Sequence, residues 1–357
     1  MNCSTSYSDL FSRVYVTKEA LPFPAARRVL NRLHDITVQE IEGADEIPEE
    51  FKNASTLFIT TSRGRVVSRC PGSKGHVCCN YLTVDLYLGC TLGCTYCIMR
   101  NYLNFDPVTV YVDTEKGVEK VREIADAHPN LVIRAGTGEV GDSLQLDPLF
   151  ELSKDYIEGL SSLGNVYFEL KTKTANVDHL LSIPDKGNCV IGFSLNPDSI
   201  AREEEVCAAP LSARLDAAEK AVEHGYNLSF HFDPIIYSDK WQELYFPVVE
   251  RLNHFPASKV AWISLGTLRY PPKLKSHFED RPFAYQEFVP CADGKHRYIQ
   301  KIRSAMYRGM VERLAESCDA PVYLCMESAA VWKNVFGSMP GRLSSMADIF
   351  HRPGGID

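Results

Sequence analysis

Three cysteines stand close together in the segment GCTLGCTYCIM, which covers residues 89–99. They are Cys90, Cys94 and Cys97, in the spacing C-x3-C-x2-C. Gly89 and Gly93 allow the backbone to curl, so that three thiolates can grip one corner of an iron–sulfur cluster. A [4Fe–4S] cluster normally takes four cysteines. Three ligands leave one iron open for a group that the protein does not supply.

A structural zinc site is the alternative for the same thiols. It would borrow Cys70, His76, Cys78 or Cys79 from the segment CPGSKGHVCCN. Zinc sites usually pair C-x2-C units across longer gaps, so the spacing favours the cluster. A second metal site in CPGSKGHVCCN is left open beside a structural turn. Four cysteines in regular segments are predicted to be small buried hydrophobic side chains: Cys189, Cys207, Cys318 and Cys325.

Short β-branched runs alternate with amphipathic runs from Leu82 onward. The expected strands cover residues 82–89, 131–135, 166–172, 189–195, 227–232 and 259–267. Before the fifth run, Leu211, Leu215 and Ala218 recur at helical spacing and Gly225 ends the helix. This alternation predicts an α/β fold with a parallel sheet, and six strands predict a partial barrel. Ligands of such a barrel lie at the carboxyl ends of the strands, where the cysteine loop falls.

The cysteine spacing after a strand resembles the cluster loop of radical S-adenosylmethionine (SAM) enzymes. The resemblance implies that the open iron chelates the amino and carboxylate groups of SAM. One electron then breaks the sulfonium C–S bond and gives a 5′-deoxyadenosyl radical.

The ends of three expected strands carry candidate SAM contacts. Gly138 and Glu139, in GTGE after the second strand, resemble the motif that receives the SAM amino group; a plain turn is the alternative. Lys173 ends the third strand, where it can meet the SAM carboxylate. Ser194 and Asn196 end the fourth strand and suit the ribose hydroxyls. Each is an ordinary strand-end polar residue when taken singly, and their shared face favours a site.

Longer stretches resemble spore photoproduct lyase, a radical SAM enzyme that reverses a thymine dimer in DNA. They are residues 11–33, CCNYLTVDLYLGCTLGCTYC, LKTKTANVDHLL, GFSLNPD and GYNLSFHFDPIIYSDKW. The resemblance implies a partial (β/α)6 TIM-type barrel at residues 81–268, after an N-terminal extension at residues 1–80. Residues 269–357 would form a C-terminal α/β segment that is basic, aromatic and turned toward the substrate. Apart from a helix at residues 25–33, the first 80 residues are expected to be irregular.

The same resemblance implies roles for single residues and partners. Tyr96, beside the third cluster cysteine, and Arg269, at the end of the sixth strand, are candidate catalytic residues. Tyr96 and Asp233 are further candidate contacts to the cofactor. The cofactors would be a [4Fe–4S] cluster and SAM, with a flavodoxin- or ferredoxin-type protein as the electron donor.

Two positions depart from the lyase pattern. The lyases carry a cysteine after the second strand that returns a hydrogen atom to the substrate radical, and the alignment places Glu139 there with Val140 beside it. The lyases also carry tyrosines on both sides of the third cluster cysteine, whereas this chain has Tyr96 and Ile98. Either the hydrogen donor or the substrate therefore differs.

Charge is distributed unevenly. The formal net charge of −8 disfavours general attraction to nucleic acid, but residues 269–313 hold ten Lys and Arg against five Asp and Glu. Aromatic residues are interleaved with these cations, as in a nucleic-acid groove, so DNA contact is expected through Arg269, Lys273 and Lys275. The alternative is a solvated charge run whose aromatic residues lie in the core.

Three functions remain open on these grounds. The first is a radical SAM enzyme of the lyase-like group that acts on DNA. The second keeps the radical chemistry but uses a peptide or a small metabolite, and the third is a cluster- or zinc-bearing protein without turnover. No apolar run reaches membrane-spanning length and no signal peptide is recognisable, so we expect a cytoplasmic protein without a membrane partner.

Overall fold

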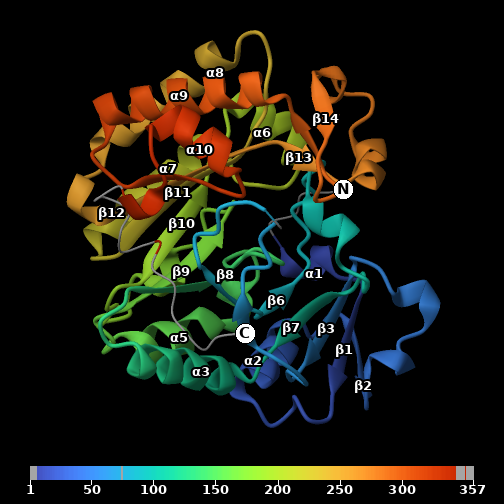
Figure 1. Cartoon of the computed structure of the whole chain (residues 1–357). Coiled ribbons are helices and arrows are strands. Elements are labelled where there is room, and N and C mark those ends of the chain that lie inside the picture. The colour runs from blue at the N-terminus through green and yellow to red at the C-terminus, as the bar shows by residue number, and fades with distance from the viewer. Residues whose placement is uncertain (1–5, 74, 343–349, 351–357) are drawn as a thin grey trace.

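The computed structural model describes residues 6–73, 75–342 and 350. Its strands form an eight-stranded sheet, a five-stranded sheet and a small three-stranded sheet. In Figure 1 the eight-stranded sheet runs through the middle of the molecule, and the five-stranded sheet lies beside it at the lower right. Within the described chain, none of the helices combines the length and the apolar character that crossing a membrane requires.

The eight-stranded sheet contains the six strands that the sequence predicts. In spatial order they are β12 (Val260–Thr267), β11 (Asn227–Ile235), β10 (Val190–Ser194), β9 (Val166–Thr172), β8 (Ile133–Thr137) and β5 (Leu82–Val84). Adjacent members of this set pair in parallel. β16 (Val322–Leu324) adds a parallel strand beyond β12, and β4 (Val67–Arg69) adds an antiparallel strand beyond β5. The predicted α/β partial barrel is therefore confirmed, with one strand more at each edge.

Helices cover this sheet on its outer face. They are α3 (Thr114–Ala127), α4 (Asp147–Phe150), α5 (Leu152–Leu160), α6 (Asp198–Glu204), α7 (Leu211–Glu223), α8 (Trp241–Glu250), α9 (Gln300–Ser317) and α10 (Ala329–Phe336). Figure 1 shows α3 and α5 side by side below the sheet, and α8, α9 and α10 at the opposite end. Packing follows the amphipathic pattern: Tyr156 of α5 stacks on Phe168 of β9 with ring centroids 4.9 Å apart.

The N-terminal region is not irregular, so that expectation is wrong. β1 (Arg13–Thr17), β2 (Thr37–Ile41) and β3 (Thr56–Thr60) pair in parallel, and β7 (Val108–Tyr111) and β6 (Tyr87–Leu88) complete this sheet. Two helices precede its second strand, α1 (Tyr7–Leu10) and α2 (Pro24–Arg32). β3 is buried at every residue, so its sequence lacks the alternation that marks a half-exposed strand.

The expected strand at residues 82–89 divides between the two sheets. β5 joins the partial barrel, whereas β6 pairs antiparallel with β7 in the five-stranded sheet. The cysteine loop therefore leaves from β6, at the junction of the two sheets. The division of the chain at residues 80 and 268 stays a prediction.

Candidate active site

The cysteine loop is held by contacts from three other segments. The Gly89 N–H donates to Val140 O at 2.8 Å, the Thr91 N–H donates to Gln145 Oε1 at 3.0 Å, and the Thr95 N–H donates to Glu204 O at 2.9 Å. Gly89 has φ of 75°, a left-handed conformation that favours glycine at this bend. The loop is thus positioned by the protein itself, between the loop after β8 and helix α6.

Cys90, Cys94 and Cys97 all line one cavity of about 580 Å³. This volume lies within the usual range of small-molecule sites. The cavity is also lined by Gly138, Glu139, Lys173, Ser194, Asp233 and Arg269, which come from the carboxyl ends of strands β8 to β12 and the residues that follow. Tyr96 lines the same cavity, so the structure brings ten of the eleven predicted site residues to one cavity, all except Asn196.

The loop after β8 approaches β9 closely at Gly138. A Cβ atom there would lie 2.7 Å from Lys171 O, and φ is 91°, so a side chain would be strained for two reasons. Glu139 follows and forms an ion pair with Lys171. The Glu139 carboxylate therefore already pairs with the ammonium group of Lys171. The sequence predicts the same kind of contact between Glu139 and the amino group of SAM.

Lys173 and Ser194 lie at the ends of neighbouring strands. The Ser194 carbonyl accepts from Arg214 Nη1 at 2.7 Å, which fixes the end of β10. Lys173 Nζ lies 3.9 Å from Glu205 Oε1, and only 14% of its side chain is exposed. Both side chains face the cavity, so both can reach a ligand there.

Asn196 and Tyr96 belong to a buried network behind the cavity. Asn196 Nδ2 donates to Glu205 Oε1 at 2.9 Å, and Tyr245 OH donates to Asn196 Oδ1 at 2.8 Å. The Tyr96 hydroxyl also donates to Glu205. Asn196 is 1% exposed and is not among the cavity-lining residues of the described chain, so its assignment to the ribose stays a prediction without a geometric contact.

Glu205 is ionised at the centre of this network. Burial raises its pKa, but the Lys173 and Arg214 cations outweigh burial and bring the pKa down to about 2. Arg214 forms an ion pair with Glu205, and both side chains are fully buried. Tyr96 and Lys173 both approach Oε1 of Glu205, so this network holds both side chains next to the cysteine loop.

Asp233 and Arg269 form a bidentate ion pair at the far wall of the cavity. Arg269 Nη1 and Nη2 lie 2.9 and 3.1 Å from the two carboxylate oxygens of Asp233. Burial raises the pKa of Asp233, but the contact with Arg269 opposes this effect, and the net shift of the pKa is downward. Arg269 is therefore held by Asp233 and is not free to contact a phosphate from its present position.

Three polar residues of the cavity were not predicted from the sequence: Glu169, Lys171 and His231. Glu169 accepts from His231 Nε2 at 2.7 Å and from Trp262 Nε1 at 3.1 Å, and Lys171 pairs with Glu139. Burial raises the pKa of Glu169, but His231 lowers it by more. A signal was present: Glu169, Lys171 and Lys173 alternate along β9, which puts all three on its inward face.

Cys70, Cys79 and Cys325 also line the cavity. The prediction of a buried hydrophobic side chain is correct for Cys189 and Cys318. It is wrong for Cys207 and Cys325, which are only half-buried, and Cys325 faces the cavity. Its backbone follows β16, a three-residue strand that the sequence analysis missed. Among the described residues, no three His, Cys, Asp or Glu side chains are placed as ligands of a single metal ion, the three loop cysteines included. The second metal site stays a prediction.

The basic segment is folded differently from the expected groove. Its aromatic residues pack on one another; Tyr270 lies 4.9 Å from Phe288 and 5.1 Å from Phe278 between ring centroids. These rings sit around a three-stranded sheet of β13 (Arg269–Tyr270), β15 (His296–Tyr298) and β14 (Phe288–Pro290). Tyr285 differs, since it is 72% exposed with Lys275 Nζ 5.2 Å from its ring centre. The alternative of aromatic residues in the core therefore holds for most of the segment.

Comparisons with known proteins agree on one family. A family model described as spore photoproduct lyase matches residues 11–265. The spore photoproduct lyase of Bacillus subtilis (strain 168) is 27% identical over 259 residues, which cover 67% of this chain and 72% of the relative. The spore photoproduct lyase of Clostridium acetobutylicum is 23% identical over 280 residues, which cover 75% of this chain and 81% of the relative.

Solved structures support the fold. A structure of spore photoproduct lyase complexed with dinucleoside spore photoproduct has a TM-score of 0.76 at 22% identity, over 88% of this chain and 98% of the other. A double mutant of spore photoproduct lyase with bound AdoMet and dinucleoside spore photoproduct gives a TM-score of 0.74 at 21% identity, with the same coverage. The α/β partial barrel is thus shared along nearly the whole length of these proteins.

Proposed function

Since the chain belongs to the spore photoproduct lyase family, a family of radical SAM lyases, we propose that it uses a [4Fe–4S] cluster and SAM to act on a thymine photolesion in DNA. One observation carries the proposal: the three cysteines and every candidate SAM contact except Asn196 line the same cavity. When bound there, the cluster and SAM supply a 5′-deoxyadenosyl radical.

The residues at the cavity fit these cofactors. Cys90, Cys94 and Cys97 provide three thiolates and leave the fourth iron position to SAM. Gly138 keeps the backbone of its loop close to β9, with no side chain in the way. Glu139 accepts from the SAM ammonium, and Lys173 binds the SAM carboxylate.

The cavity walls exclude water and fix these groups. Ser194 is 6% exposed at the end of β10, and Arg214 behind it is fully buried. Charged hydrogen bonds are stronger in such surroundings than in water, because less solvent competes with them. The bidentate pair of Asp233 and Arg269 gives the opposite wall a fixed shape, against which a substrate can be oriented.

DNA contact would use the exposed cations next to the cavity. Lys273 is exposed, Lys275 lies near the exposed Tyr285 ring, and His277 of the same segment lines the cavity. Phosphates can meet the lysines, and an unstacked base can lie on Tyr285. We assign residues 269–357 to this substrate-facing part, after an extension at residues 1–80 and the barrel at residues 81–268.

The remaining partners follow from the chemistry. Reduction of the cluster needs a low-potential donor of the flavodoxin or ferredoxin type. A chain whose cluster ligands are thiols suits a reducing compartment, so we place it in the cytoplasm.

The test is an anaerobic assay of the reconstituted protein with SAM and a reductant. Dinucleoside spore photoproduct, undamaged thymidylyl-thymidine and no substrate are compared by mass spectrometry. We expect about four irons per chain, release of 5′-deoxyadenosine, and loss of the lesion. Release of 5′-deoxyadenosine with the lesion unchanged would refute the lesion as substrate and favour a peptide or a small metabolite. No cluster and no SAM cleavage would refute the enzyme.

A further inference from the structure

The cavity holds a second set of thiols besides the cluster cysteines. Cys70 follows β4, Cys79 precedes β5, and Cys325 follows β16. Cys325 is fixed by the sheet, because its N–H donates to Leu265 O of β12 at 2.8 Å. Its sulfur lies 3.8 Å from Arg269 Nη2 and is hydrogen-bonded to Asp233.

The proposed function requires a hydrogen donor in this cavity, and the inference rests on that function. A substrate radical ends its reaction by taking a hydrogen atom, and S–H bonds are among the weakest bonds to hydrogen in a protein. The loop after β8 offers no thiol, since Glu139 and Val140 stand there. The Tyr96 hydroxyl already donates its hydrogen atom to a hydrogen bond with the buried Glu205 carboxylate.

We propose that Cys325 is the residue that donates the hydrogen atom to the substrate radical. The S–H bond of Cys325 breaks homolytically and a C–H bond forms on the substrate carbon, leaving a thiyl radical on Sγ. One electron from the flavodoxin- or ferredoxin-type donor and one proton from solvent then restore the thiol. Each turnover thus consumes one SAM and two electrons, one for SAM cleavage and one for the thiyl radical.

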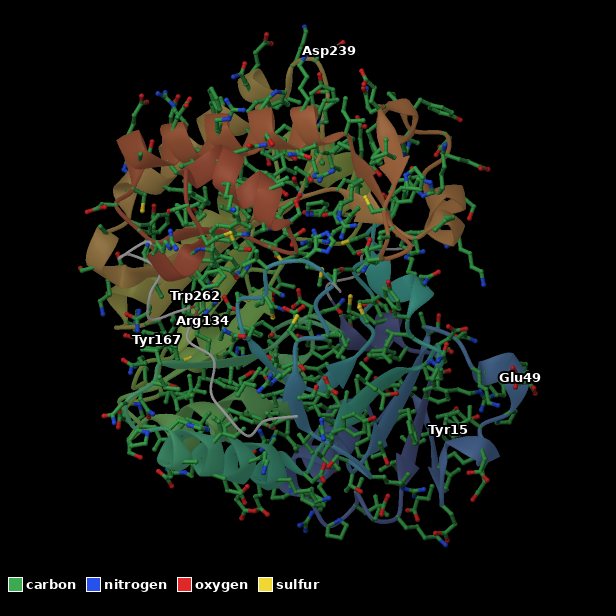
Figure 2. All side chains as sticks on the ribbon, in the orientation of Figure 1. Tyr15, Glu49, Arg134, Tyr167, Asp239 and Trp262 are labelled. Atoms are coloured by element: carbon green, nitrogen blue, oxygen red, sulfur yellow. The ribbon has the colours of Figure 1, made fainter. Side chains whose placement is uncertain are left out.

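The surroundings distinguish Cys325 from Cys79. Cys325 contacts the Asp233–Arg269 pair and, like the cluster cysteines, lines the cavity, so a substrate bound there is within reach of both. The charge of Arg134 acts on Cys79, and Arg134 is buried against Trp262 with its Cζ 4.1 Å from that ring centre. Figure 2 shows Arg134 beside Trp262 and Tyr167, deep in the sheet region. Cys79 therefore lies within reach of the Arg134 charge.

The thiol must be protonated to donate a hydrogen atom. Burial raises the pKa of Cys325 well above its ordinary value, and Asp233 raises it further, while Arg269 opposes this shift. Cys79 and Cys70 also act on it, and Lys171 and Tyr323 are further titratable groups that interact with it. The thiol form is thus the stable form at neutral pH.

Two experiments test the inference on the full-length protein. In the first, the reconstituted enzyme turns over dinucleoside spore photoproduct with dithionite and a nitrone spin trap, and trapped cysteines are located by peptide mass spectrometry. Cys325→Ala is compared with Cys70→Ala, Cys79→Ala and the distant control Cys318→Ala. In the second, the S–H stretch of the cluster-free protein is recorded by infrared difference spectroscopy against Cys325→Ala. The pH is raised to 9.0, the ordinary pKa of a thiol.

We expect the nitrone adduct on Cys325 only when SAM, reductant and lesion are all present. Cys325→Ala should still cleave SAM and consume the lesion, but clean repair should be lost to products that carry a dithionite-derived sulfinate. The Cys325 S–H band should persist at pH 9.0. Clean repair by Cys325→Ala, or an adduct on Cys70 or Cys79 instead, would overturn the inference and leave the proposed function intact. If the wild-type enzyme leaves the lesion untouched, both the proposed function and the inference on Cys325 are refuted.

Discussion

The Glu205–Arg214 pair allows a prediction whose magnitude follows from two independent routes. Glu205→Gln keeps the size of the side chain but leaves the Arg214 guanidinium buried without a counter-charge. Removing one partner of a buried ion pair costs about 3–5 kcal/mol. Independently, the pKa of Glu205 is about 2 when folded against an ordinary 4.5. That difference corresponds to about 3 kcal/mol of stabilisation at neutral pH.

The sign of the pH dependence follows from the lowered pKa. The stabilisation is complete above the unfolded pKa of 4.5 and is lost as the pH falls toward the folded value of about 2. At pH 3.5 the wild type should already have lost about 1.4 kcal/mol of this contribution. Glu205→Gln cannot titrate, so the difference in free energy of unfolding between the two proteins should shrink by that amount.

The assay is urea unfolding of both cluster-free proteins at pH 7 and at several values down to pH 3.5. Glu203→Gln is the matched control, because Glu203 lies two residues before Glu205, in helix α6, but is exposed. The control should stay within about 0.5 kcal/mol of the wild type. A Glu205→Gln variant as stable as the control, or a difference that does not change with pH, would refute the account of this network.

Three further predictions concern the cavity and its rim. SAM cleavage should be abolished in each of Cys90→Ala, Cys94→Ala and Cys97→Ala, as measured by iron content and release of 5′-deoxyadenosine. The control Cys318→Ala should behave as the wild type, and native cleavage by any one of the three variants would refute the assignment. Glu139→Ala should weaken SAM binding by about 1.5–3 kcal/mol in a titration, and unchanged affinity beside the exposed control Glu123→Ala would remove Glu139 from the SAM site. Replacing Lys273 and Lys275 by Gln should lower the salt dependence of duplex DNA binding by about 0.9 per lost phosphate contact; an unchanged slope would place the DNA elsewhere.

The sequence was sufficient where the signal is local. Cys90, Cys94 and Cys97 are defined by their spacing alone, and the β9 prediction, residues 166–172, agrees with the structure at both ends. Parallel strands of a barrel are short apolar runs between amphipathic helices, so each repeat of the pattern supports the next. The carboxyl ends of these strands could therefore be placed on one face, and Glu139, Lys173 and Ser194 with them.

The sequence was insufficient where position depends on long-range pairing. β16 has three residues and pairs with β12, about 60 residues earlier, so nothing local identifies it or places Cys325 at the cavity. The same holds for β6. It belongs to the continuous run at residues 82–89, but it pairs with β7 in the five-stranded sheet. Arg269 illustrates a different limit: its position was expected, but its bidentate contact with Asp233 depends on side-chain geometry.

Charge pairing inside the cavity ranks its cations as ligands. Lys171 is paired with Glu139, and Arg269 is held by both oxygens of Asp233. Among the described residues, Lys173 forms one ion pair, with Glu205 at 3.9 Å, and its Nζ donates no hydrogen bond. Glu205 in turn is already bound by Arg214. A carboxylate that enters the cavity therefore displaces an existing partner at Lys171 or Arg269 but none at Lys173. Losing the hydrogen bonds of a buried charge is costly. Lys173 is therefore the favoured site for the carboxylate.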